Sequence, residues 1–389
     1  MDRRTFLSLS AATVAGLGLG GLSGCGGDGE PTAEGGGNPS PTGASTSSTG
    51  STTPMLGPAD VHGLRLLPGF TARLVATTGM LVPGTGTTWH TDPDGGACFE
   101  QDDGGWIYVS NSESEPGGAS SLRFAADGSI TAAARILDGT VRNCAGGATP
   151  WSTWLSCEEH ADGLVWECDP TGAAAAVRRP GLGVFQHEAV CADPGSAALY
   201  LTEDEPDGAF YRFTPTRWGD LGAGVLEVMV ESSPGDLRWV EVPDPERRDA
   251  SARPTRSQVP GTKAFNGGEG TCRLGDGIAF TTKGDDKVWR YDPSTADLRV
   301  LYDPGTAADP ILSGVDNCIA LGPDLFVCED GGDMQVIRLR SDGSVQAVVQ
   351  VAGNDGSEIT GVAFSPDGRR MYFSSQRNPG ATYEVAGAW

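Results

Sequence analysis

The sequence predicts an all-β fold, a six-bladed β-propeller with a metal site at one mouth of its central channel. Three observations predict it. A unit of short strands repeats six times along the chain, at about 40 residues per unit, as in propellers. The 3.6-residue periodicity of amphipathic helices is nearly absent. Polar or acidic residues recur at the same two places in each unit.

Each unit contains a hairpin whose first strand ends in polar or acidic residues and whose second strand returns after a short loop. A further short strand and a tight turn precede the hairpin, most clearly from Gly361 to Gly368 with its Pro-Asp-Gly turn. A large β-sandwich is the alternative, but a sandwich would not repeat so regularly. The six hairpins span residues 106–124, 153–170, 199–213, 278–293, 325–339 and 371–385.

The N-terminal segment carries two export signals. A twin-arginine pattern, Asp2-Arg3-Arg4-Thr5-Phe6-Leu7, opens an apolar run that is short for a membrane span. The run ends in Leu22-Ser23-Gly24-Cys25, which resembles a lipobox. We therefore expect a signal peptide over residues 1–25 with lipidation of Cys25. An ordinary signal peptide with a chance cysteine is the alternative.

The rest of the chain divides into a tether and one domain. Residues 26–54 are rich in Gly, Ser, Thr and Pro, which is typical of a disordered linker, and residues 55–389 form the propeller domain. The polar insert 243–261 is interpreted as a long loop. We expect a monomer exported by the twin-arginine route, a cell-surface or periplasmic lipoprotein that meets the membrane only through its lipid.

The charge balance limits the partners. With 51 acidic against 27 basic residues, the formal net charge is −24. A nucleic-acid partner is excluded, because phosphates need a basic face. No glycine-rich phosphate loop lies between a strand and a helix.

The acidic residues converge in space if the fold is a propeller. In each blade, the innermost strand lines the channel and the second strand runs antiparallel to it. The first residues of the inner strands and the last residues of the second strands therefore lie on the same face of the propeller. The inner strands begin with Asn143-Cys144, His187-Glu188, Glu269-Gly270, Asp316-Asn317 and Glu358, and the second strands end with Asn111/Glu113, Glu158-Glu159, Glu203-Asp204, Lys283/Asp285, Glu329-Asp330 and Gln376.

Such a cluster cannot be fully ionised on its own. Two like charges about 4 Å apart repel by about 4 kcal/mol at an effective dielectric of 20. Oxygen ligands suit a hard cation such as Ca²⁺, and a thiolate from Cys144 would favour a softer transition metal beside it. A solvated acidic rim is the alternative.

Cysteines and histidines leave further alternatives open. Cys144 lies opposite Cys157 on the neighbouring predicted strand, so a disulfide is possible instead of a metal ligand. Cys318 and Cys328 face each other in the same way, and spacing alone does not fix the pairing. His187 is either a site residue or a buried structural histidine.

One segment resembles a known family. Residues 143–159, Asn-Cys-Ala-Gly-Gly-Ala-Thr-Pro-Trp-Ser-Thr-Trp-Leu-Ser-Cys-Glu-Glu, are similar to the signature of the PhoX-type alkaline phosphatases. Weaker matches follow in the right order, and the resemblance covers nearly everything from about Pro58 onward. They are Phe185–Val190, Tyr200–Asp204, Phe210–Phe213, Glu269-Gly270, Cys328–Gly331 and Phe364–Gly368.

The resemblance implies an exported propeller phosphatase that uses calcium and iron, Fe³⁺ or another transition metal, to hydrolyse phosphate monoesters. Cys144 matches the iron-ligating cysteine. Catalytic roles fall to Cys144, Glu159 and Glu269, and substrate binding to Lys283 and His187. The candidate metal ligands are Cys144, Glu158, Glu159, Glu188, Glu203, Glu269, Asp316, Glu329 and Glu358.

The chain departs from the family pattern at two places. Gly267 stands where family members commonly carry a phosphate-gripping arginine, and Lys283 is the nearby cation that could replace it. The first blade reads Asn111-Ser112-Glu113 where a histidine is expected in the middle. Two other functions therefore stay in view: a calcium-dependent lactonase-type hydrolase, and a non-catalytic calcium-binding surface propeller.

Overall fold

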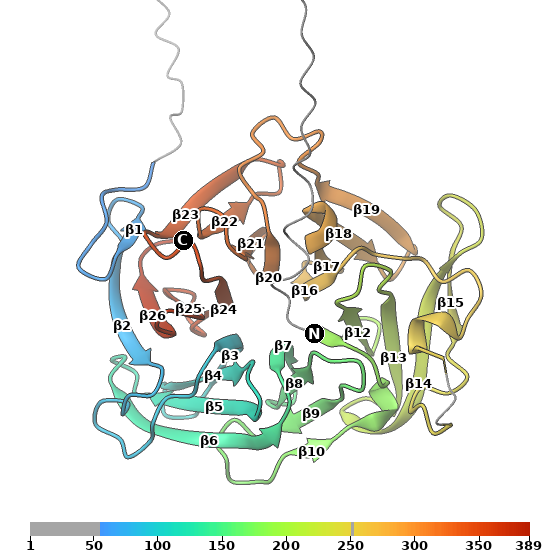
Figure 1. Cartoon of the computed structure of the whole chain (residues 1–389), viewed down its shortest axis with the longest axis horizontal. Coiled ribbons are helices and arrows are strands. Elements are labelled where there is room, and N and C mark those ends of the chain that lie inside the picture. Colours follow the sequence, from blue (N-terminus) through green and yellow to red (C-terminus); the bar gives the residue numbers. More distant parts are fainter. Residues whose placement is uncertain (1–54, 250–252) are drawn as a thin grey trace, which may run out of the picture. The chain divides into compact units, whose positions relative to one another are not determined.

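The computed structural model of the protein describes residues 55–249 and 253–389. The expected signal peptide, Cys25 and the linker 26–54 lie outside the described residues. Within them, six antiparallel sheets surround a central channel, and the predicted six-bladed β-propeller is confirmed (Figure 1). None of the helices in the described ranges is long or apolar enough to span a bilayer.

Each sheet is one blade, with its strands hydrogen-bonded in order from the channel outward. In the first three blades the strands are β3 (Pro93–Glu100), β4 (Trp106–Ser112), β5 (Gly117–Phe124) and β6 (Ile130–Thr140); β7 (Asn143–Ala148), β8 (Trp154–Glu158), β9 (Val165–Cys168) and β10 (Val177–Arg178); β11 (His187–Asp193), β12 (Ala198–Glu203), β13 (Phe210–Arg217), β14 (Asp220–Glu231) and β15 (Leu237–Glu241).

The other three blades complete the ring, and two of them take their outermost strand from the N-terminal side of the domain. Their strands are β16 (Gly268–Leu274), β17 (Gly277–Thr282), β18 (Lys287–Asp292) and β19 (Asp297–Tyr302); β20 (Val315–Leu321), β21 (Asp324–Glu329), β22 (Gln335–Leu339), β23 (Val345–Val351) and β1 (Leu64–Leu66); β24 (Ile359–Phe364), β25 (Arg370–Ser375), β26 (Ala381–Ala386) and β2 (Thr71–Thr77).

The ring closes because segments far apart in sequence share a sheet. Strand β2 pairs with β26, so the last blade is built from both sides of the chain (Figure 1). In the part of the chain that the structure describes, three short 3-10 helices occupy loops: η2 (Pro180–Leu182), η3 (Thr255–Ser257) and η4 (Lys283–Asp285). The described part of the insert 243–261 contains η3 and no strand, as the loop interpretation expected.

Apolar side chains fill the spaces between blades. Phe210 of the third blade stacks on Phe280 of the fourth with ring centroids 4.3 Å apart, and both are fully buried. Burying such rings removes large apolar areas from water. The interblade packing therefore fixes how far each inner strand stands from the next.

A bulge interrupts every inner strand at the same depth. The register between the first and second strand of each blade shifts across a two-residue step, and a bulge of this kind re-aims side chains. The bulged pairs are Asp94-Gly95, Cys144-Ala145, Glu188-Ala189, Glu269-Gly270, Asp316-Asn317 and Gly361-Val362.

Candidate metal centre

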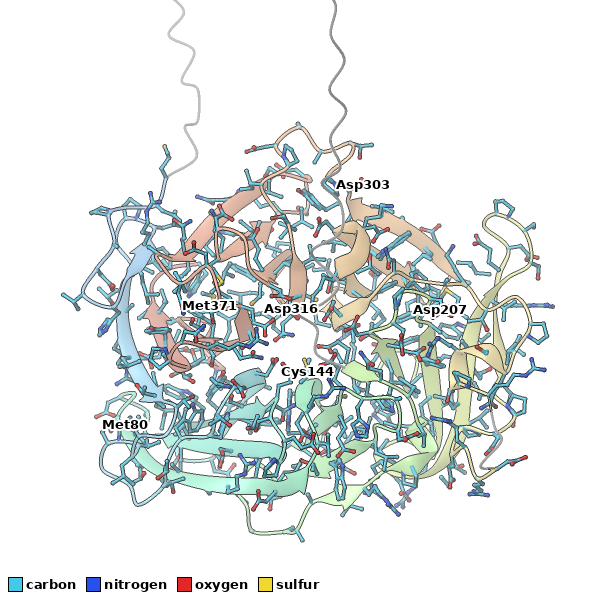
Figure 2. All side chains as sticks on the ribbon, in the orientation of Figure 1. Met80, Cys144, Asp207, Asp303, Asp316 and Met371 are labelled. Carbon is cyan, nitrogen blue, oxygen red and sulfur yellow. The ribbon has the colours of Figure 1, made fainter. Side chains whose placement is uncertain are left out.

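The first residue of each bulged pair defines a ring of six positions around the channel. Five of the six hold a metal-capable side chain, namely Asp94, Cys144, Glu188, Glu269 and Asp316, and the sixth is Gly361. Cys144 and Asp316 lie near the middle of the molecule, on different blades (Figure 2).

The ring residues approach one another closely enough to share a cation. Among the described residues, three groups have ligand atoms within 4.8 Å of one another: Asp94, Glu113 and Cys144; Cys144, Glu159 and Glu188; and Glu188, Glu269 and Asp316. Because Cys144 and Glu188 each belong to two groups, the three form one continuous band. Five of the predicted ligands, Cys144, Glu159, Glu188, Glu269 and Asp316, are thus brought together.

Hydroxyl and amide groups hold the band in place from the preceding blade. Thr281 of β17 donates to the backbone oxygen of Asp316 at 2.7 Å, and Thr202 of β12 donates to that of Glu269 at 2.5 Å. Asn111 of β4 donates to the backbone oxygen of Cys144 at 2.9 Å. Three blades therefore hold the ligand backbone of the next blade.

The ends of the second strands carry acidic pairs whose two members face opposite ways, because strand side chains alternate. The second member of each pair faces the band. Glu159 is part of it, and Asp330 forms an ion pair with Lys283 at 3.0 Å. Burial raises the pKa of Glu269, and the charge of Asp204 raises it further.

The first member of each pair braces a loop, which replaces the ligand role expected for Glu158, Glu203 and Glu329. Glu158 accepts the backbone N–H of Val141 at 3.0 Å, and Glu329 accepts that of Gln335 at 2.9 Å. These three residues are in none of the candidate metal groups. The sequence prediction took both glutamates of the first pair and only the first member of the other two, because it did not determine which member faces the channel.

Glu203 has three partners of its own. It accepts hydrogen bonds from the backbone of Ala209 at 3.0 Å and from Tyr211 at 2.8 Å, and it pairs with Arg256 at 2.9 Å. A carboxylate with this many donors is committed to its loop.

Glu358 also stands apart from the ring, three residues before the ring position Gly361. It forms an ion pair with the half-exposed Arg377, whose guanidinium lies 3.7 Å from Glu113. Burial, and then the charge of Asp330, raises the pKa of Glu358 to about 7. The structure thus places Glu358 on an arginine and outside the three metal groups.

Lys283 lies beside the band, as predicted. Its Nζ is 3.0 Å from Glu269 Oε1 and 3.0 Å from Asp330 Oδ2, with the side chain 31% exposed. Burial lowers the pKa of Lys283, but the surrounding carboxylates, Glu269 first, more than offset this and raise it well above the usual value. A cation partly open to solvent therefore stands at this end of the channel.

Gly267 adjoins Lys283 directly. A Cβ at position 267 would lie 3.8 Å from the Lys283 Cβ, and the backbone N–H of Lys283 donates to Gly267 O at 2.8 Å. Gly267 has a φ of +69°, a conformation that glycine adopts without strain. The Lys283 side chain therefore begins next to the backbone of Gly267.

His187 has a structural environment. It is fully buried, its Nε2 donates to Gly183 O at 3.0 Å, and its ring lies 3.6 Å from that of Phe185. Burial lowers its pKa to about 3. The ring is in none of the metal groups, so the structure supports the structural alternative rather than substrate binding.

The described cysteines are all free thiols. Cys144 Sγ donates to Glu188 Oε1 at 3.1 Å, whereas Cys157 packs in the apolar core, so the two do not pair. Cys318 is level with Val327 in the sheet, not with Cys328. Neither of the disulfides considered from the sequence is present in the structure.

Electrostatics favour a bound cation at the band. Burial is the largest cause that raises the pKa values of Glu188, Asp316 and Cys144 well above normal, and nearby carboxylates raise those of Glu188 and Cys144 further. A positive ion would reverse this effect and favour the ionised forms. Buried carboxylates together with one thiol therefore fit a hard cation and a softer one.

Three residues of the site were not among the predicted ligands: Glu113 and Gln376 were named only as strand ends, and Asp94 was not singled out from the sequence. Asp94 is the ring residue of the first blade, Glu113 shares its metal group, and Gln376 donates to both. The signal for Asp94 was the small pair that follows it, Gly95-Gly96, which parallels the small residues after Cys144 and Glu269. Small residues are needed there because a Cβ at Gly95 would lie 2.5 Å from Ala145 Cα.

Comparisons with known proteins identify a family and a fold. The sequence pattern of the family described as alkaline phosphatase PhoX matches residues 110–166 and 160–298. A search of curated protein sequences finds no match. The solved structure of Pseudomonas fluorescens PhoX in complex with vanadate, a transition state analogue, has a TM-score of 0.72 and 15% identity, covering 86% of this chain and 97% of that one.

Two further solved structures are similar at lower scores. A gluconolactonase from Xanthomonas campestris has a TM-score of 0.45 and 12% identity, covering 86% of this chain and 94% of that one. A catalytically inactive virginiamycin B lyase from Staphylococcus aureus has a TM-score of 0.43 and 13% identity, covering 82% and 100%. At these identities the structural likenesses concern the fold alone.

The fold and the family pattern together define an alkaline-phosphatase-type hydrolase built on a six-bladed propeller. The chain belongs to the PhoX family, as the signature around Cys144 predicted. The matched residues include Cys144, Glu159, Glu188, Glu269 and Lys283.

Proposed function

We propose that this protein is an exported, metal-dependent hydrolase of phosphate monoesters that uses Ca²⁺ together with Fe³⁺ or another transition metal. The observation that carries the proposal is the pair of linked groups within the band, Cys144–Glu159–Glu188 and Glu188–Glu269–Asp316, with Lys283 beside the second. The first of these two groups contains a thiol, and the second contains oxygen ligands alone.

The donor types divide the cations between the two ends. Thiolate favours a transition metal, and carboxylates favour calcium, so Cys144 would hold the former and Glu269 and Asp316 the latter. Bound cations would bind phosphoryl oxygens and activate the attacking oxygen. Glu188, shared between the groups, would keep the two ends at a fixed separation.

Lys283 supplies the protein's own contact to the phosphate in this proposal. It begins beside Gly267, where the family arginine is missing, and its Nζ is already held between Glu269 and Asp330. As a flexible point charge, lysine binds phosphate without the bidentate geometry of arginine. We therefore assign Lys283 to substrate binding.

Hydrolysis of an aryl phosphate by purified protein, with elemental analysis of the same sample, tests the proposal. We expect activity in the wild type, and loss of both activity and transition metal in Cys144→Ser with calcium retained. Cys98→Ser, a change at a half-buried cysteine outside the three groups, is the control and should keep both.

Two other results would overturn the proposal. Hydrolysis of a lactone without any aryl phosphatase activity would favour the lactonase-type alternative. Calcium binding with neither activity would favour a non-catalytic surface propeller.

The location of the protein is part of the proposal. The twin-arginine pattern and the lipobox-like Cys25 support an exported, cell-surface or periplasmic lipoprotein with its membrane contact limited to the lipid. We propose a monomer that acts on small phosphoesters and does not bind nucleic acid.

A further inference from the structure

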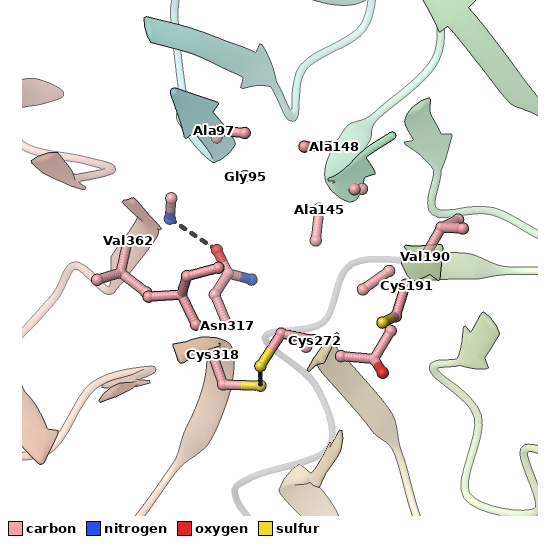
Figure 3. A pocket seen from close by; sticks show the side chains of 18 of the residues that line it. Gly95, Ala97, Ala145, Ala148, Val190, Cys191, Cys272, Asn317, Cys318 and Val362 are labelled. Atoms are coloured by element: carbon pink, nitrogen blue, oxygen red, sulfur yellow. Dashed lines mark hydrogen bonds between the residues drawn. The ribbon is translucent and has the colours of Figure 1, made fainter. Parts of the chain in front are cut away.

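A second layer of functional side chains lies beyond the band, deeper along the inner strands. Cys191 of β11, Cys272 of β16 and Cys318 of β20 line a cavity of about 230 Å³ whose other walls are mostly glycine and alanine (Figure 3). Nothing in the proposed hydrolase chemistry uses these three thiols. All three are buried, with side chains at the cavity surface.

Two of the three sulfurs meet across adjacent blades. Cys318 Sγ and Cys272 Sγ are 3.9 Å apart, and the two are drawn together in Figure 3. Their strands, β16 and β20, are neighbouring inner strands of different sheets. No backbone ladder therefore joins the strands that carry this thiol pair.

Gly270 explains why the strands come so close. A Cβ at this position would lie 2.5 Å from the backbone nitrogen of Cys318 and 2.7 Å from Asn317 Cα, so only glycine permits the approach. Cys272 follows two residues later on the same face of β16. The close approach at Gly270 thus delivers Cys272 to Cys318.

We propose that Cys272 and Cys318 are a modification site: an oxidisable pair that forms a disulfide between the fourth and fifth blades. A disulfide needs sulfurs about 2 Å apart, so the pair must close by about 2 Å, which side-chain rotation can supply. In this structure the bond is not formed.

The oxidant is a small-molecule disulfide that enters the cavity. One thiol, deprotonated, attacks a sulfur of the oxidant and releases the first small thiol, which leaves a mixed disulfide. The second thiolate then attacks the protein sulfur and releases the second small thiol. The protein pair loses two electrons and two protons in total, and the oxidant gains them.

The bond would join the two strands that carry Glu269 and Asp316. Each carboxylate lies within three residues of its cysteine along the chain. Oxidation would therefore lock the spacing of these strands, an effect on stability that does not depend on phosphatase activity.

The test treats full-length protein with cystamine at pH 8.5, then alkylates the remaining thiols under denaturing conditions for intact mass and peptide mapping. The wild type should lose two thiols, yield a peptide that links Cys272 to Cys318, and melt at a higher temperature than the reduced protein. Cys272→Ala and Cys318→Ala should form no such link. Cys191→Ala, the same change in the same cavity, should behave as the wild type.

Three outcomes would overturn the proposal. The first is that Cys272 and Cys318 both remain free thiols in the treated wild type. The second is a disulfide-linked peptide that contains Cys191. The third is a protein that does not react with cystamine but in which one equivalent of cuprous ion protects both thiols from alkylation. The last result would make the pair a soft-metal site. If Cys272→Ala or Cys318→Ala does not fold, peptide mapping of the wild type alone decides.

Discussion

Adjacent carboxylates at the ends of the second strands have different roles, because successive side chains of a strand point to opposite sides. One carboxylate points into a loop, and the next points into the channel. Glu203 is bound by backbone, tyrosine and arginine donors, whereas the charge of Asp204 acts on Glu269. Arg256 is the partner that keeps Glu203 paired. The role of each of these carboxylates therefore depends on whether its side chain points into a loop or toward the channel.

The role of Lys283 is testable through its charge. Lys283→Ala should lower kcat/KM for an aryl phosphate by roughly 10- to 100-fold, since a hydrogen bond to a charged group is worth about 1.5–3 kcal/mol. The inhibition constant of inorganic phosphate should rise with it. Lys283→Arg should retain much of the activity.

Lys287→Ala is the matched control for that change. Lys287 is also ion-paired, with Asp285 at 3.0 Å, but outside the metal groups, and its loss should leave kcat/KM unchanged. Equal effects of the two alanine variants would contradict a phosphate-binding role for Lys283.

The burial of His187 can be tested through the pH dependence of the protein's stability. Burial lowers its pKa to about 3, below the unfolded value near 6.5, so its contribution to stability is fully present above pH 6.5 and is lost as pH falls toward 3. Between pH 6.5 and 4.5 the loss is about 2–3 kcal/mol. His187→Phe should remove that part of the acid sensitivity in urea unfolding, and parallel pH curves for the two proteins would contradict it.

The elements could largely be predicted from sequence, because hairpin alternation and turn residues are local signals. All six predicted hairpins are present. The bulges could not be predicted, since a one-residue shift in register depends on the partner strand. That is why Glu358 was expected as a ligand although the ring position of its blade is Gly361, and why Asp94 was missed.

At the scale of elements, the blades are coupled through side chains that hold the next blade's ligand backbone. Thr281 donates to Asp316 O, and no strand ladder connects β17 to β20. A side-chain hydroxyl therefore links neighbouring blades, whereas backbone hydrogen bonds link the strands within each blade. Cation affinity at one blade should then depend on residues of the blade before it.

Thr281→Val should uncover this coupling, because valine keeps the shape and removes the donor. We expect about 1–3 kcal/mol less stability, since a buried carbonyl loses its partner, and weaker calcium binding by calorimetry. Thr281→Ser should restore both. Thr271→Val removes a hydroxyl that donates to Ala279 O within its own blade, so it should lower stability alone. Unchanged calcium affinity in Thr281→Val would contradict the coupling.

On the scale of the whole molecule, repulsion among the carboxylates of the band destabilises the closed arrangement of six blades. Glu188, Glu269 and Asp316 come from three different blades, and after burial the charges of Glu269 and Asp316 raise the pKa of Glu188 further. Apolar packing between blades forces these groups together whether or not a cation is present. A cation that binds the band would therefore stabilise the ring as a whole.

Removal of cations should consequently lower the melting temperature of the entire propeller. A ligand that binds only the folded state adds about 2.7 kcal/mol at 100 times its Kd, which corresponds to a shift of roughly 4 °C for a domain of this size. Calorimetry with excess chelator, then with calcium restored, should show the fall and its recovery. Glu269→Gln removes one charge from the band, so its melting temperature should fall less when cations are removed. In this variant the carboxylates repel one another less without a cation, and the band binds the cation less tightly. A melting temperature that is the same with and without chelator would instead indicate carboxylates that are solvated or protonated, and would remove the basis for a metal-dependent enzyme.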